Sequence, residues 1–323
     1  MTTLPHFICL GFQKSGTTTL FEILRQHPDV VLARDVKEPM YYRVLVIDAV
    51  PVLGREWFYE HRYWRHVKPG DDRLRGEINA GLTFSHCAHK IARDMPSDVK
   101  LLFMMREPVA RAFSAYKYFL ARGHLPEWVV DYDFAHGHAR AFDRYVHWVL
   151  DDPERRSDVM RRRLEYLVLS QSNYATCVEE YLQYFPVAQI KPIFFEEFVA
   201  DQHAACLDLY GFLGLEDNPA IDYTIHGNEG KERPTSWKAA NKERVVKGWN
   251  YGFREFAVME YWGKGIYDVW SRYHARVRAQ AMEPDWDRSK LLPETRAYLR
   301  EYYNEEVRRL ERIFDRDLSQ LWY

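Results

Sequence analysis

The stretch GFQKSGTTTL, residues 11–20, determines how the rest of the sequence is interpreted. Gly11 and Gly16 have the separation found in a nucleoside-triphosphate phosphate loop, which runs Gly, four residues, Gly, Lys and then Ser or Thr. Threonines follow the second glycine here, and the one lysine of the stretch, Lys14, lies between the two glycines. The stretch therefore predicts a phosphate-binding loop whose cation stands earlier than in the triphosphate loop.

The residues on either side give this loop the context that a phosphate site needs. HFICLGF, residues 6–12, is a short apolar run that reaches a glycine, and it predicts a buried strand. TTTLFEILRQHP, residues 17–28, has apolar residues at helical spacing and ends at a proline, so it predicts a helix. The N-terminus of a helix presents free N–H groups and a partial positive charge, and both favour a bound phosphate.

Strands and helices continue to alternate after this opening. VKLLFMMREP, residues 99–108, contains a nearly continuous apolar run, which is typical of a parallel strand covered on both faces. Helices are also predicted at 109–123, 174–186, 205–215 and 291–314, and a strand at 189–198. This order predicts an α/β, P-loop-like fold of three layers, with a central parallel sheet flanked by helices and helical additions at the C-terminus. Segment 238–290 shows no strand pattern, and no linker divides the chain, so residues 1–323 are expected to form a single domain.

Composition narrows the class of protein. The net charge of −2 gives no reason to expect nucleic acid or an anionic membrane as a partner. The N-terminus lacks the basic region of a signal peptide, and no run of about 18 apolar residues is present to span a membrane. The four cysteines are scattered without a disulfide or metal-binding spacing, so reduced thiols and a cytoplasmic location are expected.

A second stretch suggests a second anion-binding group. In REPVARAFSAYKYF, residues 106–119, Arg106 ends a predicted strand and Ser114 lies two turns into the next helix. A triphosphate loop would need a metal-binding acid at such a strand end, so a cation there implies a metal-free anion site. The alternative is that Arg106 pairs with Glu107 or with a distant acid and that Ser114 only fills a helix face.

A third stretch offers a base. In DVKEPMYY, residues 35–42, Glu38 follows Lys37 and precedes a proline, which favours extended backbone at the glutamate. A carboxylate held near a phosphate site can remove a proton from a hydroxyl group. Taken alone, the same residues are typical of a solvated charged turn.

Taken together, the three stretches resemble the sulfotransferase superfamily, whose donor is 3′-phosphoadenosine-5′-phosphosulfate (PAPS). QKSGTTTL resembles the family's 5′-phosphosulfate loop, and REPVARAFSAYKYF resembles its 3′-phosphate segment. KEPMYY is similar to the Lys-Glu-Pro stretch of the heparan sulfate and bacterial carbohydrate branch, whose glutamate is the base. The resemblance continues through SNYATCVEEYLQYFP, YGFLGL and the final predicted helix, so it covers nearly the whole chain.

The resemblance implies transfer of a sulfuryl group from PAPS to a hydroxyl of a small-molecule metabolite or saccharide, with release of the bisphosphate PAP and without a metal. Lys14 would stabilise charge that develops on the bridging oxygen, and Glu38 would act as the general base. The donor contacts implied are Lys14, Ser15, Gly16, Thr17, Thr18 and Thr19 for the 5′-phosphosulfate, Arg106 and Ser114 for the 3′-phosphate, and Gly230, Lys231 and Arg233 in a late loop. The resemblance also allows a homodimer.

One departure from the family bears on the acceptor. Many relatives carry Glu-Lys-Ser/Thr-Pro after the base, whereas this chain has Glu77 followed by Ile78. Loss of that cation favours a small acceptor over a sulfated polysaccharide. Aromatic residues could stack on a sugar but are predicted to pack in the core instead; they are Trp57, Phe58, Tyr59, Tyr63 and Trp64. The basic run at 155–166 is interpreted as a solvated helix face.

Two other functions remain open from the sequence. A small-molecule kinase of the P-loop class would bind ATP and require Mg²⁺, but the Gly-Lys-Ser/Thr sequence is missing. A catalytically dead nucleotide-binding scaffold would keep the fold and bind PAP weakly or not at all. The histidines of HCAH (86–89) and HGH (136–138) lack a nearby third ligand, so no metal site is expected.

Overall fold

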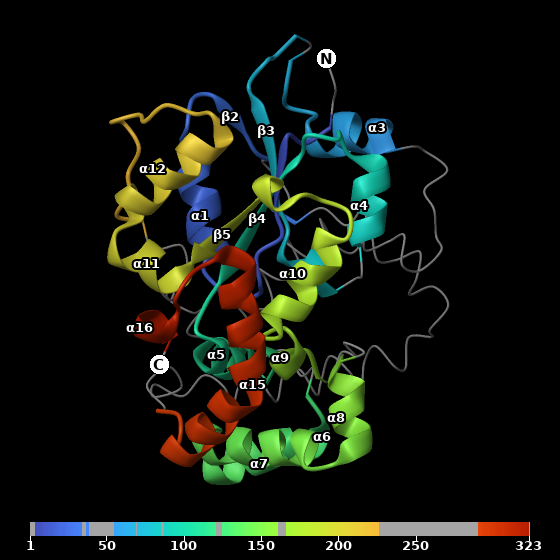
Figure 1. Ribbon diagram of the computed structural model, residues 1–323, viewed down its shortest axis with the longest axis vertical. Coiled ribbons are helices and arrows are strands. Elements are labelled where there is room, and N and C mark those ends of the chain that lie inside the picture. The colour runs from blue at the N-terminus through green and yellow to red at the C-terminus, as the bar shows by residue number, and fades with distance from the viewer. Residues whose placement is uncertain are drawn as a thin grey trace, which may run out of the picture.

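The computed structural model describes residues 4–33, 37–38, 55–68, 70–84, 87–120, 125–160, 166–225 and 290–322. Its centre is a five-stranded sheet in the order β2-β3-β1-β4-β5, and every described pair of neighbouring strands is parallel (Figure 1). The strands are β1 (Phe7–Cys9), β2 (Val30–Val31), β3 (Leu74–Ile78), β4 (Lys100–Met105) and β5 (Ile190–Phe194). The first predicted strand is thus placed next to the strand that carries Arg106 at its end.

One face of the sheet packs against two helices on the right in Figure 1, α4 (Ala88–Asp94) and α10 (Tyr174–Leu182). Leu101, Phe103 and Met105 of β4 are fully buried in the core cluster on this side. Alternate residues of a strand point to opposite faces, so the residues between them belong to the other layer.

The opposite face packs against α1 (Thr17–Leu24) and α12 (Gln202–Leu213). Leu102 and Met104 of β4 lie in this second cluster, beside Leu20 of α1. Helices therefore cover both faces, and the predicted three-layer α/β fold is confirmed.

A third apolar cluster lies below the sheet in Figure 1 and is built mainly by helices. The long C-terminal helix α15 (Pro293–Phe314) crosses this cluster and continues past α10, with Leu299 and Leu310 both fully buried. The remaining helices here are α5 (Pro108–Leu120), α6 (Glu127–His136), α7 (His138–Leu150), α8 (Pro153–Met160) and α9 (Leu167–Ser170). The predicted C-terminal helix is confirmed.

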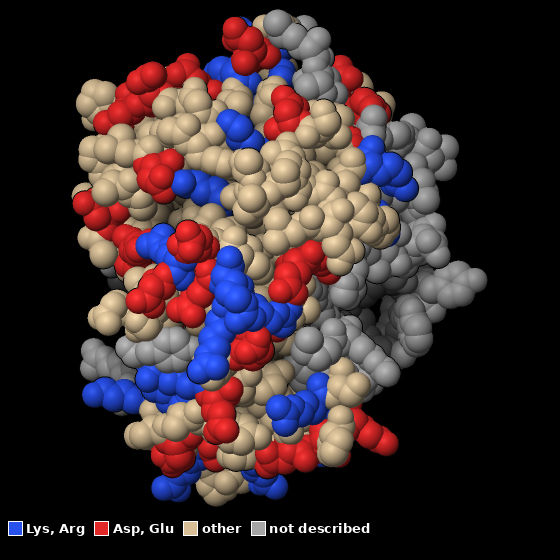
Figure 2. Space-filling model, viewed as in Figure 1, with Lys and Arg blue, Asp and Glu red and all other residues tan. Residues whose placement is uncertain are grey.

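Several short elements complete the described chain. They are α3 (Arg55–Phe58), the π-helical turn η1 (Tyr59–Tyr63), the 3₁₀ turns η2 (Ala80–Phe84) and η4 (Val187–Gln189), α11 (Phe195–Ala200) and α16 (Ser319–Trp322). None of the described helices has both the length and the apolar character that crossing a bilayer demands. Basic and acidic side chains are intermingled over the face shown in Figure 2.

Two predictions about strands need correction. The strand predicted at 189–198 ends at Phe194, and a helix begins at Phe195. The helix start is held by Glu196, which accepts hydrogen bonds from the Glu107 backbone N–H and from the Trp322 indole. The prediction was wrong because these partners come from distant parts of the chain. Strands β2 and β3 were not predicted at all.

The aromatic residues of 57–64 are mostly core residues, as predicted. Tyr59, Tyr63 and Trp64 are buried, and Phe58 packs against the same cluster. The prediction was wrong for Trp57, which keeps 38% of its surface exposed and stacks on a histidine side chain. The buried tyrosines matter for the site because their hydroxyl groups bond to it.

Candidate active site

The loop between β1 and α1 has a backbone shape that depends on its glycines. Gly16 has φ of 93°, and a Cβ added there would lie 2.7 Å from the Phe195 ring. A Cβ added at Gly11 would lie 2.4 Å from the Thr17 side chain. The predicted glycine spacing is therefore explained by left-handed backbone at one glycine and close packing at both.

Lys14 lies in this loop and has the left-handed φ of 72°, which costs an L-residue about 1 kcal/mol. Its ammonium group lies 5.2 Å from the centre of the Tyr118 ring on α5. Ser15 is fully buried, and its hydroxyl has no hydrogen-bond partner among the described residues. A strained lysine beside an unsatisfied buried hydroxyl is expected where the loop is built for a ligand.

The third predicted stretch meets the first turn of α1. Lys37 Nζ donates hydrogen bonds of 3.0 Å to Thr17 Oγ1 and 3.2 Å to Thr18 Oγ1. The same ammonium lies 3.8 Å from a carboxylate oxygen of Glu38. Tyr63 Oη donates to the backbone carbonyl of Lys37 at 3.5 Å. The structure therefore brings the predicted base to the predicted phosphate loop, and Thr19 follows in the same helix.

The second predicted stretch reaches the loop from β4. Arg106 Nη1 donates to the backbone carbonyl of Lys14 at 3.5 Å, and the Arg106 guanidinium stacks on Phe195. Glu107 does not pair with Arg106. Its carboxylate accepts hydrogen bonds from the first N–H groups of α5 and contacts Arg296. The alternative Arg106–Glu107 pair is therefore not formed. Ser114 lies two turns into α5 and is half-buried.

Gln171 supports the loop, and its role was not predicted from the sequence. Its side-chain oxygen accepts from the Gln13 backbone N–H at 3.3 Å, and its amide donates to Thr83 Oγ1 at 2.9 Å. Gln171 is buried, so these bonds hold the loop against the segment after β3. No periodicity or spacing marks this glutamine in the sequence.

Glu77 is a buried carboxylate at the end of β3, next to β1. Tyr59 Oη donates to it at 2.7 Å and Asn79 Nδ2 at 3.0 Å. Burial raises the pKa of Glu77 to about 7 despite these two donors, and the charge of Glu38 raises it further. Ile78 beside it is fully buried in the core, so this strand end contributes no cation.

We expect Glu77→Gln to stabilise the protein at high pH. The folded-state pKa is raised above 4.5, so folding takes up a proton, and the stability contributed by Glu77 falls as pH rises from about 4.5 through 7. The substitution should raise the free energy of unfolding by about 2 kcal/mol at pH 8 and by less than about 0.5 kcal/mol at pH 4.5.

Urea unfolding at the two pH values measures this difference. Glu60→Gln is the matched control, because Glu60 is exposed on η1. An equal change for Glu77→Gln at both pH values would contradict the raised pKa.

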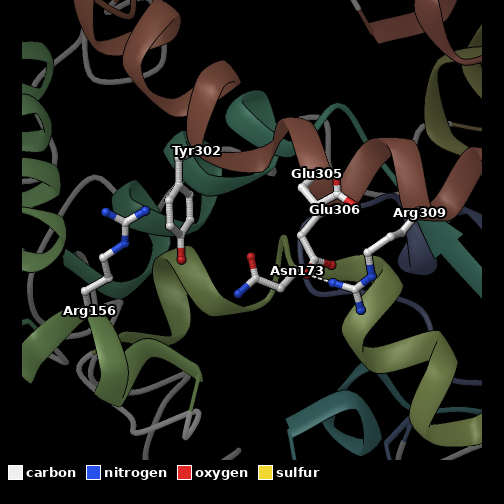
Figure 3. Close-up of a pocket in the computed structure, with 6 residues that line it drawn as sticks. All are labelled: Arg156, Asn173, Tyr302, Glu305, Glu306 and Arg309. Carbon is white, nitrogen blue, oxygen red and sulfur yellow. Dashed lines mark hydrogen bonds and ion pairs between the residues drawn. The ribbon is translucent and has the colours of Figure 1, made fainter. Parts of the chain in front are cut away.

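A separate cavity of about 240 Å³ lies between α15 and the start of α10 (Figure 3). Its charged groups are largely paired within the fold: Arg309 donates to Glu306 at 2.8 Å and also bonds to Glu179. Arg156 stacks on the Tyr302 ring at the other end. The cavity is lined by Arg156, Asn173, Tyr302, Glu305, Glu306 and Arg309. The Arg309–Glu179 contact attaches α15 to α10, and the Arg156–Tyr302 contact attaches it to α8, so these groups serve to pack the helices.

Two predictions cannot be compared with this geometry. Gly230, Lys231 and Arg233 of the predicted late loop lie outside the described residues. Part of HCAH also lies outside them, while in HGH the His138 ring bonds to Asp133. Among the residues that are described, no three His, Cys, Asp or Glu side chains are grouped to hold a metal ion.

Known proteins share both the sequence pattern and the fold. The chain is 27% identical over 246 residues to heparan sulfate glucosamine 3-O-sulfotransferase 3B1 of Mus musculus and 26% identical over 246 residues to heparan sulfate glucosamine 3-O-sulfotransferase 3A1 of Homo sapiens. These alignments cover 73% and 75% of this chain but 52% of each relative, so the chain spans about half the length of the curated relatives it matches.

A solved structure shares the fold over most of the chain. The sulfotransferase from Alicyclobacillus acidocaldarius superposes with a TM-score of 0.59 at 21% identity, covering 98% of both chains. The family model described as the sulfotransferase domain matches residues 4–310, a range that includes the loop, the base stretch and Arg106. The chain therefore belongs to the sulfotransferase domain family.

Proposed function

We propose that this protein transfers a sulfuryl group from PAPS to a hydroxyl group of a small-molecule or saccharide acceptor. One observation carries the proposal: Lys37 bonds the base stretch to the phosphate loop, and Arg106 bonds to the same loop from β4. The loop and Arg106 follow the carboxyl ends of the adjacent parallel strands β1 and β4, where α/β folds place their ligand sites, and Lys37 joins the base stretch to the first turn of α1 there.

The residues at this position suit a donor with two separate anionic groups. The N-terminus of α1, the Lys14 ammonium and the threonine hydroxyls suit the 5′-phosphosulfate end. Arg106 and Ser114 suit the 3′-phosphate, since arginine binds phosphate through paired N–H groups. The unsatisfied Ser15 hydroxyl and the left-handed Lys14 support a loop that is completed by a ligand.

When bound, PAPS supplies the sulfuryl group and the bisphosphate leaving group. Glu38 would accept the proton of the acceptor hydroxyl, because its carboxylate is 41% exposed and lies beside the phosphate loop. Lys14 would stabilise the charge that develops on the oxygen linking sulfur to the nucleotide. Buried Glu77 is held by two donors and faces no solvent, so it is not the base.

The proposed acceptor is a compound with a free hydroxyl group, and two observations bear on its class. The names of the curated relatives state that they act on heparan sulfate glucosamine, and this favours a saccharide hydroxyl. Buried Ile78 removes one cation that a polyanionic chain would need, and this favours a small or neutral acceptor.

Calorimetry with PAP tests the donor half of the proposal. PAP should bind with a dissociation constant in the micromolar range, ATP should bind at least about tenfold more weakly, and EDTA should change neither value. Transfer of label from sulfur-labelled PAPS to a panel of sugars, phenols and alcohols then tests the activity. Tighter binding of Mg²⁺-ATP than of PAP would support the kinase instead, and absence of PAP binding would support the scaffold.

A further inference from the structure

Lys37 joins the base stretch to the candidate donor loop but is not among the donor contacts implied by the sequence. It donates to both Thr17 Oγ1 and Thr18 Oγ1, and its side chain keeps only 22% of its surface exposed. Burial lowers its pKa, and the charges of Glu38 and Glu22 and the Cys9 thiol oppose that shift. Removing an ammonium group from water costs free energy, so a half-buried lysine at this position suggests a function for its charge.

The hydrogen bonds of Lys37 to the two threonines leave donors that a ligand can use. An ammonium has three N–H bonds, and the two threonines accept two of them. The remaining N–H does not complete a hydrogen bond to Glu38, because their separation is 3.8 Å. A threonine oxygen that accepts from Lys37 still has its own O–H to donate. Lys37 therefore orients the hydroxyls of Thr17 and Thr18 as donors and adds one more itself.

The position of Lys37 differs from that of Lys14. Lys14 reaches the site from the loop and lies over the Tyr118 ring of α5, whereas Lys37 lies at the first turn of α1 beside the proposed base. The end of strand β3 contributes no cation to the site, because Ile78 is buried in the apolar core. Lys37 therefore lies between the threonines at the start of α1 and the carboxylate of Glu38.

We propose that Lys37 is a second cation of the donor site and binds the sulfonate end of PAPS, next to the acceptor side. This inference rests on the proposed function. A negatively charged sulfonate would replace the long contact to Glu38 with a charge-assisted hydrogen bond. Lys37 would also separate the charge of Glu38 from that of the donor.

The test compares donor and product, which differ in the sulfonate. Lys37→Ala should weaken PAPS binding by about 30-fold, as for loss of a hydrogen bond to a charged group, and PAP binding by less than about threefold. Lys37→Arg should keep PAPS binding within about fivefold of wild type, because it keeps the charge. Calorimetry without acceptor gives all these values, and thermal unfolding without nucleotide checks that each variant is folded.

Two further variants separate charge from structure. Lys37→Gln keeps an N–H donor for the threonines without the charge, so it should lose PAPS affinity as Lys37→Ala does. Lys68→Ala removes an exposed lysine that follows η1 and should change nothing. Equal losses for PAPS and PAP, or wild-type PAPS affinity in Lys37→Ala, would overturn the role of Lys37 alone. Failure of the wild-type protein to bind PAPS would overturn the proposed function and this inference together.

Discussion

Replacing Lys14 with alanine is expected to lower kcat for sulfuryl transfer by about 1,000-fold. A cation that stabilises the leaving oxygen acts mainly in the transition state, so kcat should fall much more than the affinity for PAP. Labelled-sulfur transfer at saturating donor measures kcat, and calorimetry measures PAP binding.

A second substitution at the same position separates charge from backbone strain. Lys14→Gly relieves the left-handed φ of 72° by about 1 kcal/mol, which offsets the extra freedom of glycine in the unfolded chain. This variant should unfold near the wild-type temperature and still be as inactive as Lys14→Ala. Wild-type activity in either variant would remove Lys14 from the mechanism, whereas Lys68→Ala should behave as wild type.

Replacing Glu38 with glutamine is expected to lower kcat by about 1,000-fold, within the range for loss of a general base. Glutamine keeps the shape of the side chain and its position beside Lys37, so binding of PAP should change by less than about threefold. Steady-state rates and calorimetry on the same preparation test both statements.

The control for Glu38 is another carboxylate of the same region. Glu60→Gln, at an exposed position of η1, should retain wild-type kcat. Glu38→Asp should recover part of the activity, since it restores a carboxylate one methylene short of its place. Full activity of Glu38→Gln would show that another group removes the proton. Glu38 would then be only part of a solvated charged turn.

Local sequence pattern was enough to predict the elements that carry the site. The strand–loop–helix unit around Gly11 and Gly16, the strand before Arg106 and the long helix α15 all follow from apolar periodicity and glycine or proline signals. These signals are local. A strand buried on both faces appears as a continuous apolar run, and an amphipathic helix appears as apolar residues three or four positions apart.

Strand β3 shows why other elements could not be predicted. Its sequence LRGEI places Arg75 and Glu77 at buried positions, so it lacks the apolar run of a central strand. Arg75 is satisfied by a backbone carbonyl and Glu77 by Tyr59 and Asn79. Gly76 is needed because a Cβ there would lie 2.0 Å from the Phe7 ring. Each of these reasons lies in another part of the chain.

Local sequence pattern was sufficient to predict the phosphate loop, the strands and helices that carry the site, and the three stretches with the candidate residues. The folded chain was needed to show that Lys37 bonds to Thr17 and Thr18, that Arg106 donates to the loop and does not pair with Glu107, and that Gln171 supports the loop. Backbone preference acts within a few residues, whereas these hydrogen bonds join residues 19 to 158 positions apart, so they form only after the chain has folded.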